Sequence, residues 1–96
     1  MSDDKNELTI AVVESFDFSL YQNFRDAYHE VEVRGIKIIL DLSKADYMDS
    51  SALGMILLLK DHAEELSGEL IIYKPTATVD KILEIAQFHK LMTIQH

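Results

Sequence analysis

Two consecutive serines, Ser50 and Ser51, are the residues of this chain whose type and position best support chemistry. They follow Asp49 and open a predicted helix that runs from about Ser51 to Leu66. The first N–H groups of a helix have no partner within the helix, and the dipole is positive at that end, so an added negative charge is stabilised there. The pattern is therefore compatible with a phosphorylated serine, although two serines before an apolar helix more often serve only as a cap. The simpler interpretation is that Asp49 or Ser50 only caps the helix, and the two interpretations are compatible.

Catalysis by these serines is not supported by the sequence. A serine nucleophile needs a base within hydrogen-bond reach, and His62 on the same predicted helix would lie about 16 Å from Ser51 at ~1.5 Å of rise per residue. The chain has no GxSxG elbow and no GxxxxGK phosphate loop. Asp41 ends a predicted strand as the phosphoacceptor aspartate of a response regulator does, but the first strand ends with one carboxylate, Glu14, where that site needs a pair. We expect no enzymatic activity and no cofactor.

The charge of the chain limits the partners that it can bind. Asp and Glu outnumber Lys and Arg by 17 to 9, which gives a net charge of −8. Nucleic acids and anionic membranes both require a basic surface, so protein partners with basic patches are the expected ligands. The chain has no cysteine and its four histidines are scattered, so no metal site is expected, nor is a small-molecule substrate.

The termini and apolar runs predict a cytoplasmic protein. Residues 1–7 are polar and acidic, unlike a signal peptide, and are expected to form a flexible tail. The longest apolar run, 55–59, is too short to cross a bilayer.

Strand and helix patterns alternate along the chain and predict one α/β domain over residues 1–96. A small, mostly parallel sheet of about four strands is expected, covered by three or four helices. Ser19 and Gln22 have the spacing of a helix capping box, Ser67-Gly68 is a typical helix stop, and Thr76 is expected to cap the last helix. The predicted strands span 8–13, 36–41, 69–73 and 91–94, the predicted helices span 19–31, 51–66 and 76–88, and residues 42–49 are expected to form a loop that lifts Ser51 clear of the sheet.

The predicted helix after Ser51 is apolar on more than one side. We expect one stripe, Leu53, Ile56, Leu57 and Ala63, to face the sheet. The second stripe is either covered by a neighbouring helix or forms a docking surface beside Ser51. It consists of Met55, Leu58, Leu59 and Leu66.

Several short motifs resemble those of the STAS domain, the fold of bacterial anti-sigma factor antagonists. Asp41-Leu42-Ser43, followed by Met48-Asp49-Ser50-Ser51 and Leu53-Gly54, is similar to the family signature, and Phe16-Asp17 stands where the family has a Leu-Asp pair. The resemblance covers most of the chain and is greatest to small stand-alone proteins of partner-switching circuits that govern biofilm formation and motility. Ala52 replaces the family's common glycine, which is expected to place a methyl group beside the acceptor serine.

The resemblance implies an anti-sigma factor antagonist in a phosphorylation-controlled partner switch. The unphosphorylated form would bind an anti-sigma factor or a serine kinase with a GHKL-type fold, phosphorylation of Ser51 (with Ser50 as second choice) would release it, and a PP2C-type phosphatase would reverse the change. The resemblance and the predicted helix together imply a partner-binding set of Asp17, Asp49, Ser50, Ser51, Ala52, Leu53, Met55, Leu58 and Leu59. The alternative is a STAS subunit of a lipid-transport ABC system that binds constitutively, without a phosphoswitch.

Overall fold

Four parallel strands form a single sheet in the computed structural model, which describes residues 7–96. The strands lie in chain order and are β1 (Glu7–Phe16), β2 (Lys37–Met48), β3 (Glu69–Tyr73) and β4 (Thr93–Gln95). Parallel neighbours need long crossover connections, and these contain the helices α1 (Tyr21–Asp26), α2 (Ser50–Glu65) and α3 (Ala77–Ile85) and the 3-10 helices η2 (Phe18–Leu20) and η3 (Phe88–Lys90). The predicted α/β class with about four strands is confirmed.

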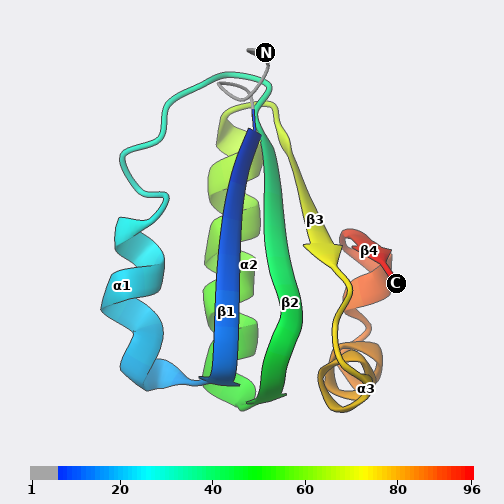
Figure 1. Ribbon diagram of the computed structural model, residues 1–96. Coiled ribbons are helices and arrows are strands. Elements are labelled where there is room, and N and C mark those ends of the chain that lie inside the picture. Colours follow the sequence, from blue (N-terminus) through cyan, green and yellow to red (C-terminus); the bar gives the residue numbers. More distant parts are fainter. Residues whose placement is uncertain (1–6) are drawn as a thin grey trace.

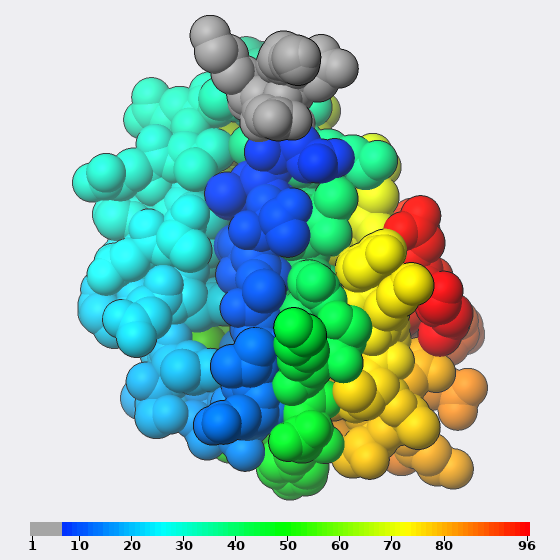
Figure 2. Space-filling view, in the orientation of Figure 1, coloured from blue at the N-terminus to red at the C-terminus, as the bar shows by residue number. Residues whose placement is uncertain are grey.

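The helices cover one face of the sheet. In Figure 1, α2 lies behind β1 and β2, and the core fills the space between them. Alternate residues of β2, Ile38, Leu40 and Leu42, are fully buried on this side. Among residues 7–96 no helix lies in front of the opposite face, where β1, β2 and β3 (blue, green and yellow) reach the surface side by side in Figure 2.

β2 is longer than the sequence predicts, because residues 42–48 continue the strand instead of forming a loop. Its register with β1 shifts twice, between Ala11 and Val13 and between Glu14 and Ser15, and each shift adds one residue on the β2 side. The buried residues of this stretch are therefore three apart, at Leu42, Ala45 and Met48. Bulges of this kind hide the alternation with a period of two by which strands are predicted.

The first helix is shorter than predicted and begins differently. Asp17 accepts a hydrogen bond from the Ser19 N–H at 2.9 Å and another from the Ser19 hydroxyl, so Asp17, not a capping box at Ser19, starts η2. After α1, where the helix was expected to continue, the chain forms turns with irregular backbone hydrogen bonds. One of them joins the Val31 N–H to the Tyr28 carbonyl at 2.9 Å. The buried face still forms, since Phe24 packs against Phe16 and Tyr28 with ring centroids 5.2 and 5.7 Å apart.

The last helix begins at its predicted cap. The Thr76 hydroxyl accepts from the Val79 N–H at 3.5 Å and donates to the Ala45 carbonyl at 2.8 Å, which ties α3 to the far end of β2. Val79 and Leu83 of α3 are fully buried on the inner side of the helix. At the other end of the chain, Glu7 belongs to β1 and not to the expected tail, and the rest of that prediction, residues 1–6, lies outside the described residues.

Candidate functional site

Asp49, Ser50 and Ser51 have separate roles at the start of α2. The Asp49 carboxylate accepts a hydrogen bond from the Ala52 N–H at 3.1 Å, so Asp49 is the cap of the helix. Its own N–H donates to the Phe16 carbonyl at 3.2 Å and fastens the helix start to the end of β1. Both serines are exposed. Because Asp49 supplies the cap, the Ser51 hydroxyl stands at the surface in the first turn of a sixteen-residue helix.

The same end of the molecule gathers the segments that were predicted to meet there. The carboxyl ends of β1 and β2 and the N-terminus of α2 all lie at the lower end of Figure 1. Asp17 is half-buried directly after β1. Phe18 is 64% exposed and stacks on Tyr21 at 5.4 Å between ring centroids. Phe18 was not among the predicted partner-binding residues, although a phenylalanine just after a strand end and before a helix is a signal for an exposed aromatic.

α2 buries a different set of residues from the stripes that the sequence suggested. Leu57 and Leu58 are 39% and 47% exposed. The buried face is Ala52, Met55, Ile56, Leu59 and Ala63. These positions follow the period of 3.6 residues and form one face. The two predicted stripes divided them wrongly.

Three predicted partner-binding residues therefore belong to the core. Ala52 and Leu59 have no exposed side-chain surface and Met55 is 3% exposed, so a partner cannot contact them. The Ala52 methyl group also points inward and does not stand beside the acceptor hydroxyl at the surface, contrary to expectation. Leu57 replaces them as an exposed apolar residue of α2.

The six remaining predicted residues, together with Phe18 and Leu57, define what we call the Ser51 surface. It combines two carboxylates, two hydroxyls and a small apolar area around the positive end of the α2 dipole. It consists of Asp17, Phe18, Asp49, Ser50, Ser51, Leu53, Leu57 and Leu58, of which Asp17, Asp49 and Leu53 are half-buried and the others exposed.

The histidine of α2 lies away from the two serines. His62 lies three turns further along α2, where its Nε2 atom is 2.8 Å from the Val31 carbonyl oxygen and its ring contacts Tyr28. This contact joins α2 to the chain that leaves α1. His62 is therefore engaged with the connection after α1 and not with Ser50 or Ser51.

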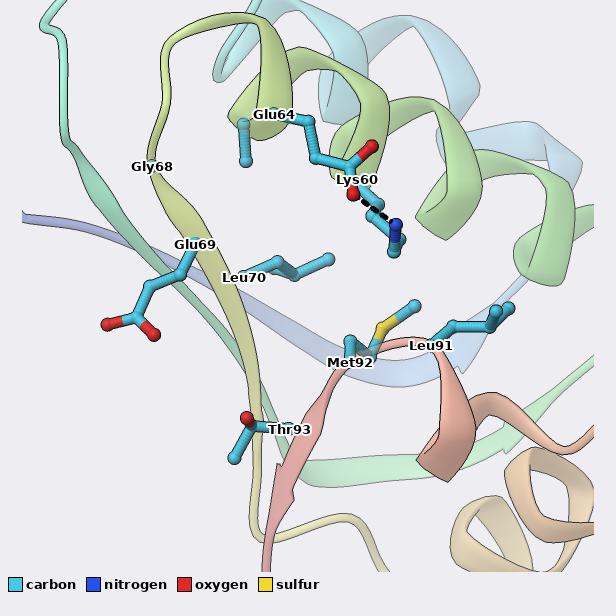
Figure 3. A pocket seen from close by; sticks show the side chains of 9 residues that line it. Lys60, Glu64, Gly68, Glu69, Leu70, Leu91, Met92 and Thr93 are labelled. Atoms are coloured by element: carbon cyan, nitrogen blue, oxygen red, sulfur yellow. Dashed lines mark hydrogen bonds and ion pairs between the residues drawn. The ribbon is translucent and has the colours of Figure 1, made fainter.

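A cavity of about 180 Å³ at the opposite end of α2 is separate from this surface. Figure 3 shows it between α2 and the segment that enters β4, with the Lys60–Glu64 ion pair on one wall and Leu91 and Met92 on the other. It opens where the short β4 leaves the beginning of β3 unpaired. Within residues 7–96 there is no cluster of three or more His, Asp or Glu side chains that could hold a metal ion. No helix in that range has the length and apolar character needed to cross a bilayer.

The family model of the STAS domain matches residues 2–96 of the chain. The chain belongs to the STAS domain family. A STAS-domain containing protein of Pseudomonas aeruginosa (strain UCBPP-PA14) is 44% identical over 93 residues, which are 97% of this chain and 92% of that protein. A candidate anti-sigma factor antagonist, BtrV of Bordetella bronchiseptica, is 28% identical over 58 residues, 60% of this chain and 50% of its own length.

Solved structures share the fold at low sequence identity. A candidate anti-sigma factor antagonist from Thermotoga maritima has a TM-score of 0.81 and 18% identity over all of this chain and 82% of its own. The anti-sigma factor antagonist SpoIIAA, in its unphosphorylated form, has a TM-score of 0.70 and 20% identity over 96% of this chain and 81% of its own. A sulfate transporter family protein from Wolinella succinogenes also matches, with a TM-score of 0.81 and 12% identity over 95% and 78% of the two chains. This STAS domain therefore has the fold that anti-sigma factor antagonists have.

Proposed function

We propose that this STAS domain is an anti-sigma factor antagonist whose binding to its partner is controlled by phosphorylation of Ser51. The observation that carries the proposal is the exposed Ser51 in the first turn of α2, where Asp49 supplies the cap and leaves the serine hydroxyl at the surface. The partner is an anti-sigma factor or a GHKL-type serine kinase, and a PP2C-type phosphatase restores the free hydroxyl. The protein acts as a binding protein and as the substrate of these enzymes.

The switch acts at the interface and not through refolding. A phosphate on Ser51 adds about −1.5 to −2 charges, and the N-terminus of α2 tolerates this charge through its N–H groups and dipole. Because the side chain is exposed, the phosphate needs no rearrangement of the core. In the complex, however, the dianion is desolvated close to the Asp49 carboxylate. Burial of an unpaired charge costs several kcal/mol, and a loss of ~3 kcal/mol weakens binding about a hundredfold.

The first experiment is to map phosphate on the protein purified from its native host. Intact mass and phosphopeptide analysis, before and after treatment with a serine phosphatase, should show one removable phosphate on Ser51. Ser50→Ala is the matched control, because it removes the neighbouring hydroxyl and keeps the cap. It should carry the same phosphate, whereas Ser51→Ala should carry none.

The second experiment tests the effect of the charge on binding. Ser51→Ala should bind the cognate anti-sigma factor as the unphosphorylated protein does, and Ser51→Asp should bind about a hundredfold more weakly in a titration. Ser50→Asp adds the same charge one residue earlier in the exposed first turn and shows whether position matters. Equal affinities for Ser51→Ala and Ser51→Asp would remove Ser51 from the mechanism.

The alternative is a STAS subunit that binds constitutively in a lipid-transport ABC system. The match to a sulfate transporter family protein shows that this fold also occurs in transporter proteins. A chain that carries no phosphate on Ser51 under any growth condition, and that co-purifies with a transporter ATPase, would favour this alternative.

A further inference from the structure

β1 is an edge strand with an unpaired side. It pairs with β2 over its length, and no other strand among residues 7–96 pairs with it. An edge strand presents a row of N–H and C=O groups that another chain can use. Over its ten residues β1 contains neither proline nor lysine, the residues that commonly protect an edge. In Figure 2, β1 (blue) lies at the surface between α1 and β2.

An apolar groove runs beside this edge. It has a volume of about 270 Å³ and is lined by Ile10, Ala11, Val12, Val13, Leu20, Asn23, Phe24 and Ala27. Ile10, Val12 and Phe24 are buried and form its floor, while Val13 is 54% exposed on its rim. The volume lies below the roughly 300–1,000 Å³ of typical small-molecule sites, and the lining offers one side-chain amide as its polar group. The groove therefore suits an apolar side chain better than a metabolite.

The charges beside the groove are acidic. Glu7 and Glu14 are exposed on β1, and Asp26 and Glu30 are exposed on α1 and the turn after it. Arg25 is the one basic residue between Glu7 and Val31 in the sequence, and it lines a different cleft, between α1 and α2. Two lysines of β2, Lys37 and Lys44, lie opposite Glu7 and Val13, on the paired side of β1 and not on its open edge. Basic groups on an incoming chain would find complementary charge here.

A second copy of this chain fits the edge poorly. Each copy carries a net charge of −8, so two copies repel one another. The edge therefore favours a partner of opposite charge.

We propose that the β1 edge and its groove bind an extended basic segment of a partner protein. The segment adds a fifth strand next to β1, places one apolar side chain against Ile10, Val12 and Phe24, and sets lysine or arginine side chains against Glu7 and Glu14. Main-chain hydrogen bonds supply affinity in this mode of binding, and the side-chain pocket supplies specificity. The site is independent of the Ser51 surface and of its phosphorylation.

The test uses the full chain, labelled with ¹⁵N, and a synthetic peptide of alternating threonine and valine with a lysine at each end. Titration followed by NMR should shift the amide signals of β1 and α1 and leave those of α3 unchanged. Glu7→Lys combined with Glu14→Lys should weaken binding of this peptide about tenfold and improve binding of the same peptide with a glutamate at each end. Glu84 is exposed on α3, away from the groove, so Glu84→Lys makes the same kind of charge change there and should not alter peptide binding.

The groove is tested separately with Ala27→Trp, at an exposed position of its lining. The indole should fill the groove and weaken the lysine peptide at least tenfold, while circular dichroism shows an unchanged fold. Failure of the lysine peptide to bind, signals that shift along α2 instead, or a dimer that pairs through β1 would each overturn the proposal.

Discussion

At the start of α2, the residues that stabilise the fold are not the residue that we propose to be phosphorylated. Asp49 caps the helix, Ala52 enters the core and Ser51 stays at the surface. Within residues 7–96 the Ser51 hydroxyl makes no hydrogen bond to another protein group, so we expect that a charge can be added there without loss of the fold. The same division explains why Ser51→Ala is a clean test of binding.

Asp41 makes folding stability sensitive to pH. Its carboxylate accepts hydrogen bonds from the Ser43 backbone N–H, at 2.9 Å, and from the Ser43 side chain, and these bonds hold the pKa of Asp41 below its usual 3.8. A lowered pKa in the folded state means that the stabilisation is present above the unfolded-state pKa and is lost as the pH falls through the folded-state value.

We therefore expect Asp41→Ala to lower the free energy of unfolding at pH 7 by at most about 1 kcal/mol, because the bond is exposed to solvent. The difference should shrink as the pH falls below about 4. Urea titrations of both proteins at pH 7 and pH 3 measure it. A difference that is equally large at pH 3 would assign the effect to packing instead of to the charge.

Among the elements, the connection from α2 to β3 depends on a close approach of two backbones. The helix ends with Ser67 in the left-handed region at φ 57°, and the Gly68 N–H bonds to the Ala63 carbonyl at 2.8 Å. Ser67 therefore takes the conformation that the sequence pattern assigns to a glycine. Gly68 is needed for another reason, since a Cβ atom there would lie 2.1 Å from the Ile36 carbonyl oxygen.

Gly68→Ala should therefore lower the free energy of unfolding by about 1–3 kcal/mol, because backbone must move to relieve the overlap. Gly54→Ala is the matched control. A Cβ atom at Gly54 meets nothing within 4 Å, and alanine in a helix interior is favoured over glycine by about 0.5–1 kcal/mol. Thermal or urea denaturation should move in opposite directions for the two variants, and a loss of stability in both would contradict this account.

Across the whole molecule, stability should be greatest at the centre of the sheet. β2 is paired on both sides, and its side chains Ile38, Leu40 and Leu42 are fully buried. β4 has three residues, and α1 has six. Short elements with exposed hydrogen bonds open at lower cost than a central strand.

Amide hydrogen exchange followed by NMR should rank these elements. We expect residues 38–42 to exchange with a free energy close to that of global unfolding, and α1 and β4 to exchange several kcal/mol more easily. Equal protection of α1 and β2 would show that the helix beside the β1 groove opens only when the whole domain unfolds.

Interactions between residues close in the sequence determined most of the secondary structure of this protein. Apolar runs separated by turn residues predict the four strands and the alternation with helices, and the caps at Asp49 and Thr76 are formed by residues three positions apart. Such signals depend on neighbours in the chain. Ser51 is exposed as expected, but the loop at residues 42–49 on which that expectation rested is wrong, because β2 continues to Met48.

Tertiary structure decided which surfaces meet. The two bulges in β2 changed the period of its buried residues, so its last seven residues were not predicted as a strand. Packing of α2 against the sheet placed Ala52, Met55 and Leu59 in the core. The groove beside β1 exists only because α1 packs next to an edge strand. Burial and register depend on contacts between residues far apart in the chain, and the spacing of apolar residues along one segment cannot specify them.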